Sequence, residues 1–148
     1  MKKLFLYLLL IGIVPSNALQ AKGSELKKKL QQAEAAYLAD NFDKALPLFL
    51  EVISGDAAND NVRFKIGICY LNSSTEKNKA ESFLETASKN TSVKYREASL
   101  KEKRAPLQTW YYLGQSYHFN YKFDQAITCF ETFRAFLGAG DSLMLKNL

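Results

Sequence analysis

His118 is the only histidine in the chain, and it lies within the aromatic segment of residues 110–130, WYYLGQSYHFNYKFDQAITCF. General acid–base catalysis by a histidine needs a second group within hydrogen-bonding reach, such as a carboxylate or a nucleophile. The segment contains neither a second histidine nor a pair of carboxylates spaced for catalysis. We therefore expect His118 to be a polar surface residue, and we expect the protein not to be an enzyme.

Metal and cofactor sites have equally little support in the sequence. One histidine and two widely separated cysteines, Cys69 and Cys129, do not provide the ligand spacing of a zinc site. The chain also lacks a glycine-rich loop of the kind that binds nucleotide phosphates. We therefore expect no metal and no cofactor.

The N-terminus has the three-part layout of a secretory signal peptide. Two lysines precede an apolar run over residues 4–14, and Pro15 separates this run from the small residue Ala18. A transmembrane helix, which is the alternative, needs about 17–25 apolar residues. We predict a signal peptide over residues 1–18, cleaved after Ala18, and an exported protein. Removal of the two lysines lowers the net charge from +5 to +3, which gives little support to nucleic-acid binding.

From Ser24 onward the apolar residues recur at helical spacing, and short polar segments separate one helical pattern from the next. Glycine, asparagine, aspartate and serine in these segments are typical of helix ends and N-caps. We expect about six helices of roughly 12–16 residues, joined by turns of about four residues. The predicted breaks follow Ala39, Ile53, Leu71, Phe119 and Leu137.

Three segments share one spacing of small and large residues. The clearest has Trp110, Leu113, Gly114, Tyr117, Ala126 and Phe130; a second has Ile66, Gly67, Tyr70, Ala80 and Leu84; a weaker one has Ala33, Ala36, Ala45 and Phe49. This spacing resembles the tetratricopeptide (TPR) repeat, in which small residues let two helices cross closely and large side chains fill the space beside them. The resemblance implies an all-α fold: a TPR solenoid of three helix-turn-helix repeats with an insertion between repeats two and three.

The repeat arrangement predicts the state of the cysteines and the domain boundaries. Cys69 and Cys129 fall on helices that are not neighbours in this arrangement, so we expect two free, buried thiols rather than a disulfide. The boundaries are residues 1–18 for the signal peptide, 19–140 for the TPR domain, about 26–59, 60–92 and 107–140 for the three repeats, and 141–148 for the start of a truncated or capping helix.

A more specific resemblance rests on the segments FDKALPLFLEVI, FKIGICYLNSSTEKNKAESFLETASKN and YREASLKEKRAPLQTWYYLGQSYHFNYKFDQAITCFETF. Together they resemble the N-terminal TPR region of Gram-negative envelope proteins that continue into a β-propeller and an OmpA-like peptidoglycan-binding domain. Some of that family serve type IX secretion and gliding. The resemblance implies a periplasmic scaffold that binds another envelope protein or its peptide segment, and is associated with the outer membrane or peptidoglycan through that partner. A small-ligand or glycan-binding module that uses groove aromatics is the alternative.

The insertion, residues 93–105, carries five lysine and arginine residues against Glu97 and Glu102. Because the acids are interspersed among the bases, we interpret it as a solvated loop or short helix of mixed charge. A basic patch for an acidic partner, a glycan or an anionic lipid is the alternative. Pro106, which follows, is suited to the first turn of the next helix.

The binding surface is predicted on the concave side of the stack, which the first helix of each pair lines. An apolar centre with polar edges suits an extended segment or a helix of a partner. The alternative is that the insertion or the first residues of the mature chain cover these side chains. The predicted groove contains Leu30, Glu34 and Tyr37 from repeat one, Phe64, Ile68 and Leu71 from repeat two, and Tyr111, Gln115 and His118 from repeat three.

Overall fold

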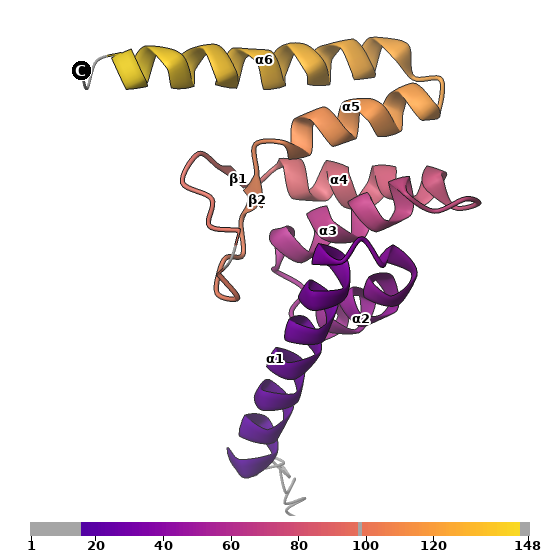
Figure 1. Ribbon diagram of the computed structural model, residues 1–148, viewed down its shortest axis with the longest axis vertical. Coiled ribbons are helices and arrows are strands. Elements are labelled where there is room, and N and C mark those ends of the chain that lie inside the picture. The colour runs from indigo at the N-terminus through magenta and orange to yellow at the C-terminus, as the bar shows by residue number, and fades with distance from the viewer. Residues whose placement is uncertain (1–15, 98, 146–148) are drawn as a thin grey trace, which may run out of the picture.

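The computed structural model describes residues 16–97 and 99–145, and this part of the chain is mostly helical (Figure 1). The all-α expectation is confirmed at this level. Most of the predicted signal peptide lies outside the described residues, and only its last three residues are seen, at the start of the first helix. The elements are α1 (Ser16–Leu38), α2 (Phe42–Gly55), α3 (Asp60–Leu71), the 3-10 turn η1 (Lys77–Lys79), α4 (Ala80–Ser88), β1 (Thr91–Ser92), β2 (Ala105–Pro106), α5 (Thr109–Phe119) and α6 (Phe123–Leu145).

The six helices form three consecutive pairs, α1–α2, α3–α4 and α5–α6, whose members pack against each other. α2 also contacts α3, and α4 contacts α5, so the pairs follow one another in chain order. Figure 1 shows this order as a progression from the indigo α1 to the yellow α6. The middle pair is therefore covered from both sides.

Gly67 and Gly114 lie where the second helix of a pair presses a large side chain against the first. A Cβ at Gly67 would lie 2.5 Å from Leu84 Cγ, and a Cβ at Gly114 would lie 2.6 Å from Phe130 Cε1. Real Cβ atoms essentially never approach another heavy atom that closely. The prediction that both glycines sit at helix crossings is confirmed.

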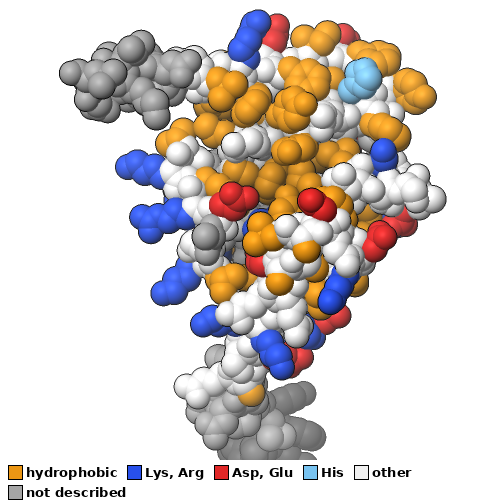
Figure 2. Space-filling model, viewed as in Figure 1, with side chains coloured by type: hydrophobic (Ala, Val, Ile, Leu, Met, Phe, Trp, Pro, Cys, Tyr) orange, Lys and Arg blue, Asp and Glu red, His pale blue; other side chains and the backbone are white. Residues whose placement is uncertain are grey.

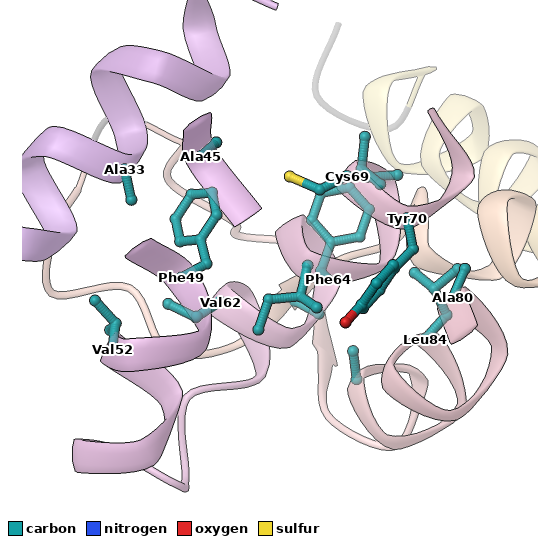
Figure 3. Close-up of a cluster of buried hydrophobic side chains, with 14 of the residues drawn as sticks. Ala33, Ala45, Phe49, Val52, Val62, Phe64, Cys69, Tyr70, Ala80 and Leu84 are labelled. Carbon is teal, nitrogen blue, oxygen red and sulfur yellow. The ribbon is translucent and has the colours of Figure 1, made fainter. Parts of the chain in front are cut away.

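The core combines large side chains with alanines on facing helices (Figure 3). Phe49 on α2 and Leu84 on α4 have no exposed surface, and the same is true of Ala45 and Ala80 at the start of those helices. Figure 3 shows Ala80 and Leu84 beside Tyr70 of the neighbouring helix α3. This alternation of sizes lets the helices approach closely without leaving voids, as dense protein interiors require.

The turns between helices explain where the helices end. Asp40 and Tyr121 have positive φ angles of 54° and 59°, which a helix cannot continue through. The side chains of Asn41 and Asn59 cap α2 and α3 by accepting hydrogen bonds from backbone N–H groups of the first helical turn. The breaks predicted from polar segments are therefore produced by the residue types expected there.

The predicted break after Leu137 does not occur. α6 runs without interruption from Phe123 to Leu145, so the last residues described belong to it and do not open a new helix at Asp141. A glycine inside a helix costs about 1 kcal/mol, which does not by itself end a helix. α1 and α6 each have 23 residues, longer than predicted, and no helix in residues 16–97 and 99–145 is long and apolar enough to cross a membrane.

Pro106 lies in a strand and not in the first turn of a helix. β1 and β2 pair in parallel, with Thr91 opposite Ala105 and Ser92 opposite Pro106. α5 begins at Thr109, whose hydroxyl donates to the Pro106 carbonyl oxygen at 2.6 Å. The expectation for Pro106 was wrong because this short bridge, formed by residues far apart in the sequence, holds the proline before the helix begins.

Candidate functional site

α3 is buried on nearly all sides, and this changes the predicted groove. Ten of its twelve residues are buried, including Phe64 at 7% and Ile68 at 5% exposure. α3 contacts α2, α4, α5 and β2, and the Phe64 ring lies 5.8 Å from the Tyr112 ring between centroids. The prediction that Phe64 and Ile68 line an exposed groove is therefore wrong, because neighbouring elements cover the face of α3 that carries them.

The residues predicted to line the groove in the first repeat make contacts within the protein. Leu30 is buried, and Glu34 accepts hydrogen bonds from the Lys65 ammonium at 2.6 and 2.5 Å. The Tyr37 ring lies 5.6 Å from the same ammonium, and burial raises the pKa of its hydroxyl. These side chains hold α1 against α3, which leaves them little freedom to contact a partner.

One buried residue, Asn61, fastens the insertion to α3. Its backbone N–H donates to the Lys103 carbonyl oxygen at 3.0 Å, and its side-chain Nδ2 donates to the Glu102 carbonyl oxygen at 3.3 Å. Its Oδ1 accepts a hydrogen bond from the Tyr95 hydroxyl at 2.8 Å. The backbone N–H and both polar atoms of the Asn61 side chain therefore bind the insertion.

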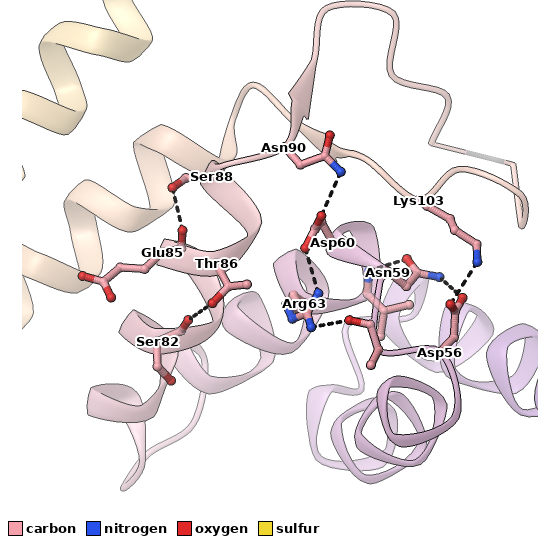
Figure 4. Close-up of polar contacts among 12 residues, drawn as sticks. Asp56, Asn59, Asp60, Arg63, Ser82, Glu85, Thr86, Ser88, Asn90 and Lys103 are labelled. Carbon is pink, nitrogen blue, oxygen red and sulfur yellow. Dashed lines mark hydrogen bonds and ion pairs between the residues drawn. The ribbon is translucent and has the colours of Figure 1, made fainter.

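Two further contacts reach the start of α3 and the turn that precedes it, one from Asn90 just before β1 and one from Lys103 of the insertion (Figure 4). Asn90 Nδ2 donates to Asp60 Oδ2 at 2.8 Å, and Lys103 Nζ lies 2.9 Å from Asp56 Oδ1. Tyr95 is half-buried, and burial first and the charge of Glu34 second raise the pKa of its hydroxyl. The insertion is therefore held on α3 through Tyr95, and the charge of Glu34 on α1 acts on the same hydroxyl.

The C-terminal end of the predicted groove stays open. Three predicted residues meet there, from two successive helix pairs, in a surface cleft of about 450 Å³. The Lys77 ammonium lies 5.2 Å from the centroid of the Phe119 ring, which is 53% exposed. We call this site the open cleft, and it is lined by Leu71, Lys77, Gln115, His118, Phe119 and Phe130.

Tyr111 extends the aromatic lining of the open cleft. It is 40% exposed, and its ring centroid lies 5.8 Å from that of Phe130 and 5.8 Å from that of Phe133. Its hydroxyl accepts a hydrogen bond from Gln115 Nε2 at 3.1 Å. Tyr111 and Gln115 are therefore held in place by each other and by α6, as predicted groove residues that remain accessible.

The turn between α5 and α6 and the first residues of α6 expose further apolar side chains beside the open cleft. Tyr121, Phe123 and Ile127 are 83%, 51% and 56% exposed, and the Phe123 ring packs edge-on against the His118 ring at 5.5 Å. Figure 2 shows hydrophobic side chains gathered at the end of the molecule that α5 and α6 form. Contiguous exposed apolar surface of this kind marks interaction sites in soluble proteins.

Both cysteines are buried free thiols, as predicted. Burial raises the pKa of the Cys69 thiol to about 12 and that of the Cys129 thiol to about 11. Because the thiolate is the reactive form, neither residue is suited to act as a nucleophile near neutral pH.

Within the part of the chain that the structure describes, no three His, Cys, Asp or Glu side chains are grouped so as to hold a metal ion. The open cleft provides aromatic rings, the Gln115 amide, the His118 imidazole and the Lys77 ammonium, which are groups that can bind a partner.

Lys77, Phe119 and Phe130 were not among the predicted groove residues. The sequence feature that could have indicated Lys77 is the interval from Gly67 to Ala80, which is one residue longer than that from Gly114 to Ala126 and makes room for η1 beside α5.

Comparisons with protein-family models, with curated proteins and with solved structures found no match. The function therefore has to be inferred from the geometry of the site.

Proposed function

We propose that the protein is a TPR-type solenoid of three repeats and acts as a protein–protein interaction scaffold in the envelope of a Gram-negative bacterium. The contact of Gly67 with Leu84 and that of Gly114 with Phe130 support this proposal, since both use the same two positions of the repeat. Recurrence of one contact in successive helix pairs is what a stacked repeat requires. The proposal also follows the sequence resemblance to envelope proteins.

The open cleft is the partner-binding site in this proposal. The observation that carries it is that Leu71, Gln115 and His118 come from successive helix pairs and line one cleft beside exposed aromatic rings. Protein interfaces combine such apolar and aromatic centres with polar edges. An extended segment or an amphipathic helix of another envelope protein fits a surface of this type.

Export to the periplasm is the second part of the proposal. It rests on the short apolar run of residues 4–14 and the small residue Ala18. In the periplasm the scaffold meets its partner during assembly of the outer membrane or of the secretion machinery. Association with the outer membrane or with peptidoglycan then comes through that partner.

Site-specific photocrosslinking in cells tests the scaffold proposal. A photoreactive amino acid at Gln115, in the open cleft, should crosslink one envelope protein, whereas the same group at the exposed residue Gln31 of α1 should not. His118→Glu should reduce the crosslink at Gln115 because it places a charge in the cleft. Equal crosslinking at both positions, or none at Gln115, would contradict the proposal.

Binding of a glycan or another small ligand is the alternative, and exposed rings such as Tyr121 and Phe123 favour it, since sugars stack on aromatic faces. Small-ligand sites, however, usually bury most of the ligand surface. Gln115, His118 and Phe119 are all exposed, so a small ligand in the open cleft would remain largely in water. Titration with peptidoglycan fragments, followed by NMR shifts of the His118 ring, separates the two functions. Saturable shifts in a protein that gives no crosslinked partner would favour the alternative.

A further inference from the structure

The insertion forms a second surface feature, separate from the open cleft. A cleft of about 490 Å³ lies on it, and all five of its lysine and arginine residues line this cleft. Figure 2 shows Lys and Arg side chains along the edge of the molecule where Figure 1 places the loop between β1 and β2. We call it the cationic cleft, lined by Lys94, Arg96, Lys101, Lys103 and Arg104 together with one serine and one glutamate. We propose that the cationic cleft binds a phosphate-bearing anion.

The fold keeps one of the two acids of the insertion, Glu97, out of the lining of the cationic cleft. Glu97 does not line the cationic cleft, and its charge acts on Tyr37 and Tyr95, whose hydroxyl pKa values it helps to raise. Of the two acids interspersed in the sequence, only Glu102 therefore lies among the basic residues of the cationic cleft.

The other acid of the insertion, Glu102, is occupied by the insertion itself. Its carboxylate Oε1 accepts hydrogen bonds from the backbone N–H of Arg104 at 3.1 Å and from Arg104 Nε at 3.3 Å. The Arg104 backbone N–H is the main cause that lowers the pKa of Glu102, and the Arg96 backbone N–H contributes to it. With its side chain only 8% exposed and paired with Arg104, Glu102 presents little charge to an incoming anion.

The cationic cleft is held in place before any ligand arrives. Asn61 binds the insertion through its backbone N–H, its Nδ2 and its Oδ1, and the β1–β2 bridge closes the insertion at its base. A site whose shape is fixed in this way loses less conformational entropy on binding than a flexible loop does. The cleft is therefore better suited to one small anion than a set of independent surface lysines would be.

The uncommitted charges point to phosphate as the ligand group. Within the described residues, Lys94, Arg96 and Lys101 form no ion pair, while Lys103 and Arg104 each pair with one acid. A phosphate group brings about two negative charges and several acceptor oxygens, which match an arginine fork and neighbouring ammonium groups. A free phosphorylated molecule and the headgroup of an anionic phospholipid both supply this chemistry.

Isothermal titration of the purified mature chain with inorganic pyrophosphate tests the proposal. Arg96→Gln with Lys101→Gln removes two of the three uncommitted charges and should weaken binding by about tenfold or more. The matched control is Lys27→Gln with Lys28→Gln, which removes the same charge from exposed positions of α1 and should leave the affinity unchanged. Circular dichroism melting checks that both double variants remain folded.

A second arm separates the two sources of phosphate. Sedimentation with vesicles of phosphatidylcholine alone and of phosphatidylcholine mixed with phosphatidylglycerol measures binding to a headgroup. Pyrophosphate binding that depends on Arg96 and Lys101 supports a free phosphorylated ligand, and binding confined to the anionic vesicles with the same dependence supports a headgroup. Absence of both, or an equal loss in the Lys27 and Lys28 control, overturns the proposal.

Asn61→Ala provides a test that leaves every charge in place. It removes the side-chain hydrogen bonds to Tyr95 and to the Glu102 carbonyl, so the insertion loses its main support. If this variant remains folded, affinity for the bound probe should fall by about tenfold, because a fixed cleft becomes a flexible loop. Unchanged affinity in a folded Asn61→Ala protein would show that diffuse charge attracts the anion, and it would contradict the proposal that a fixed cleft binds it.

Discussion

Lys65 and Glu34 form an ion pair inside the helix stack, and it joins α3 to α1. The Lys65 ammonium lies 2.6 and 2.5 Å from the two carboxylate oxygens, its side chain is 2% exposed, and that of Glu34 is 16% exposed. Removing two charges from water costs free energy that their attraction only partly returns, so such a pair contributes little net stability. Its effect is specific: Lys65 can be buried only where α1 presents Glu34.

Glu34→Gln should destabilise the protein strongly, because it leaves the Lys65 ammonium buried without a counter-charge. We expect a loss of roughly 3 kcal/mol in the free energy of unfolding, measured by urea unfolding with far-UV circular dichroism. The double variant Glu34→Leu with Lys65→Met should lie within about 1 kcal/mol of the wild type. The control is Glu25→Gln, which breaks an exposed pair with Lys29 and should cost about 0.5 kcal/mol or less. A loss in Glu34→Gln as small as that of the control would contradict the expectation.

Gly114→Ala should destabilise the third helix pair. The new Cβ meets Phe130 Cε1 at 2.6 Å, and overpacking of this kind costs about 1–3 kcal/mol. Gly23→Ala on α1 is the matched control, because a Cβ there meets no heavy atom within 4 Å and alanine favours the helix. Thermal melts of both variants compare the sites. If Gly114→Ala melts at or above the wild-type temperature, the helices are not in contact at that point.

Phe64→Ala and Tyr111→Ala should behave differently, although both positions were predicted to line the groove. Phe64 is 7% exposed, so truncation leaves a cavity and should cost about 3–5 kcal/mol. Tyr111 is 40% exposed, so Tyr111→Ala should cost clearly less while reducing crosslinking at Gln115. Urea unfolding and the crosslinking assay measure the two effects. Comparable stability losses would mean that Tyr111 belongs to the core.

The buried thiols should make the protein less stable at alkaline pH. The pKa values of Cys69 and Cys129 are raised to about 12 and about 11 from an ordinary value of 9.0, so the folded state keeps their protons when the unfolded state releases them. Their contribution is complete below pH 9 and is lost as the pH rises to about 11 for Cys129 and to about 12 for Cys69. The expected slope just above pH 9 is up to about 1.4 kcal/mol per pH unit for each thiol.

Urea unfolding between pH 8 and about 9.5 measures this effect in a window where the tyrosines are still mainly protonated in both states. The control is Cys69→Ala with Cys129→Ala, in which the slope should become shallower. Ellman's reagent should label neither thiol in the folded wild type at neutral pH and both after unfolding. Rapid labelling of the folded protein would rule out the burial described for these residues.

Cleavage of the chain after Ala18 is the prediction that tests export. Expression of the complete precursor in a Gram-negative host, followed by N-terminal sequencing of the periplasmic fraction, should give a mature chain that begins at Leu19. Ala18→Arg should block cleavage, because signal peptidase requires a small residue at the site. A protein recovered only with Met1 in place, from the cytoplasm, would exclude export.

The elements that the sequence predicted well are those with local causes. Gly67 and Gly114 could be placed at crossings because a fixed spacing of small and large residues recurs around them, and the steric reason lies within one helix pair. The caps at Asn41 and Asn59 were predictable for the same reason, since an N-cap acts on backbone groups two or three residues away.

Features that depend on distant residues were missed. The burial of Phe64 and Ile68 requires β2 and α5 to pack on α3. The sequence pattern around these two residues does not indicate these contacts. The separation of Glu97 from the cationic cleft has the same origin, since the Asn61 contacts decide which way the insertion turns. Of the predicted groove residues, Tyr111, Gln115 and His118 are exposed as expected, whereas Phe64 and Ile68 are buried by tertiary contacts.

The parallel bridge of β1 with β2 fixes the two ends of the insertion next to each other. Thr91 pairs with Ala105 and Ser92 with Pro106, so the segment between them leaves and rejoins the helix stack at one point. Neighbouring strands lie about 5 Å apart, and a loop with such fixed ends pays only about 0.6 kcal/mol in closure entropy for each doubling of its length. Foreign sequences added within the insertion should therefore be tolerated without moving a helix, provided that Tyr95, Glu102 and Lys103 keep their hydrogen bonds to Asn61.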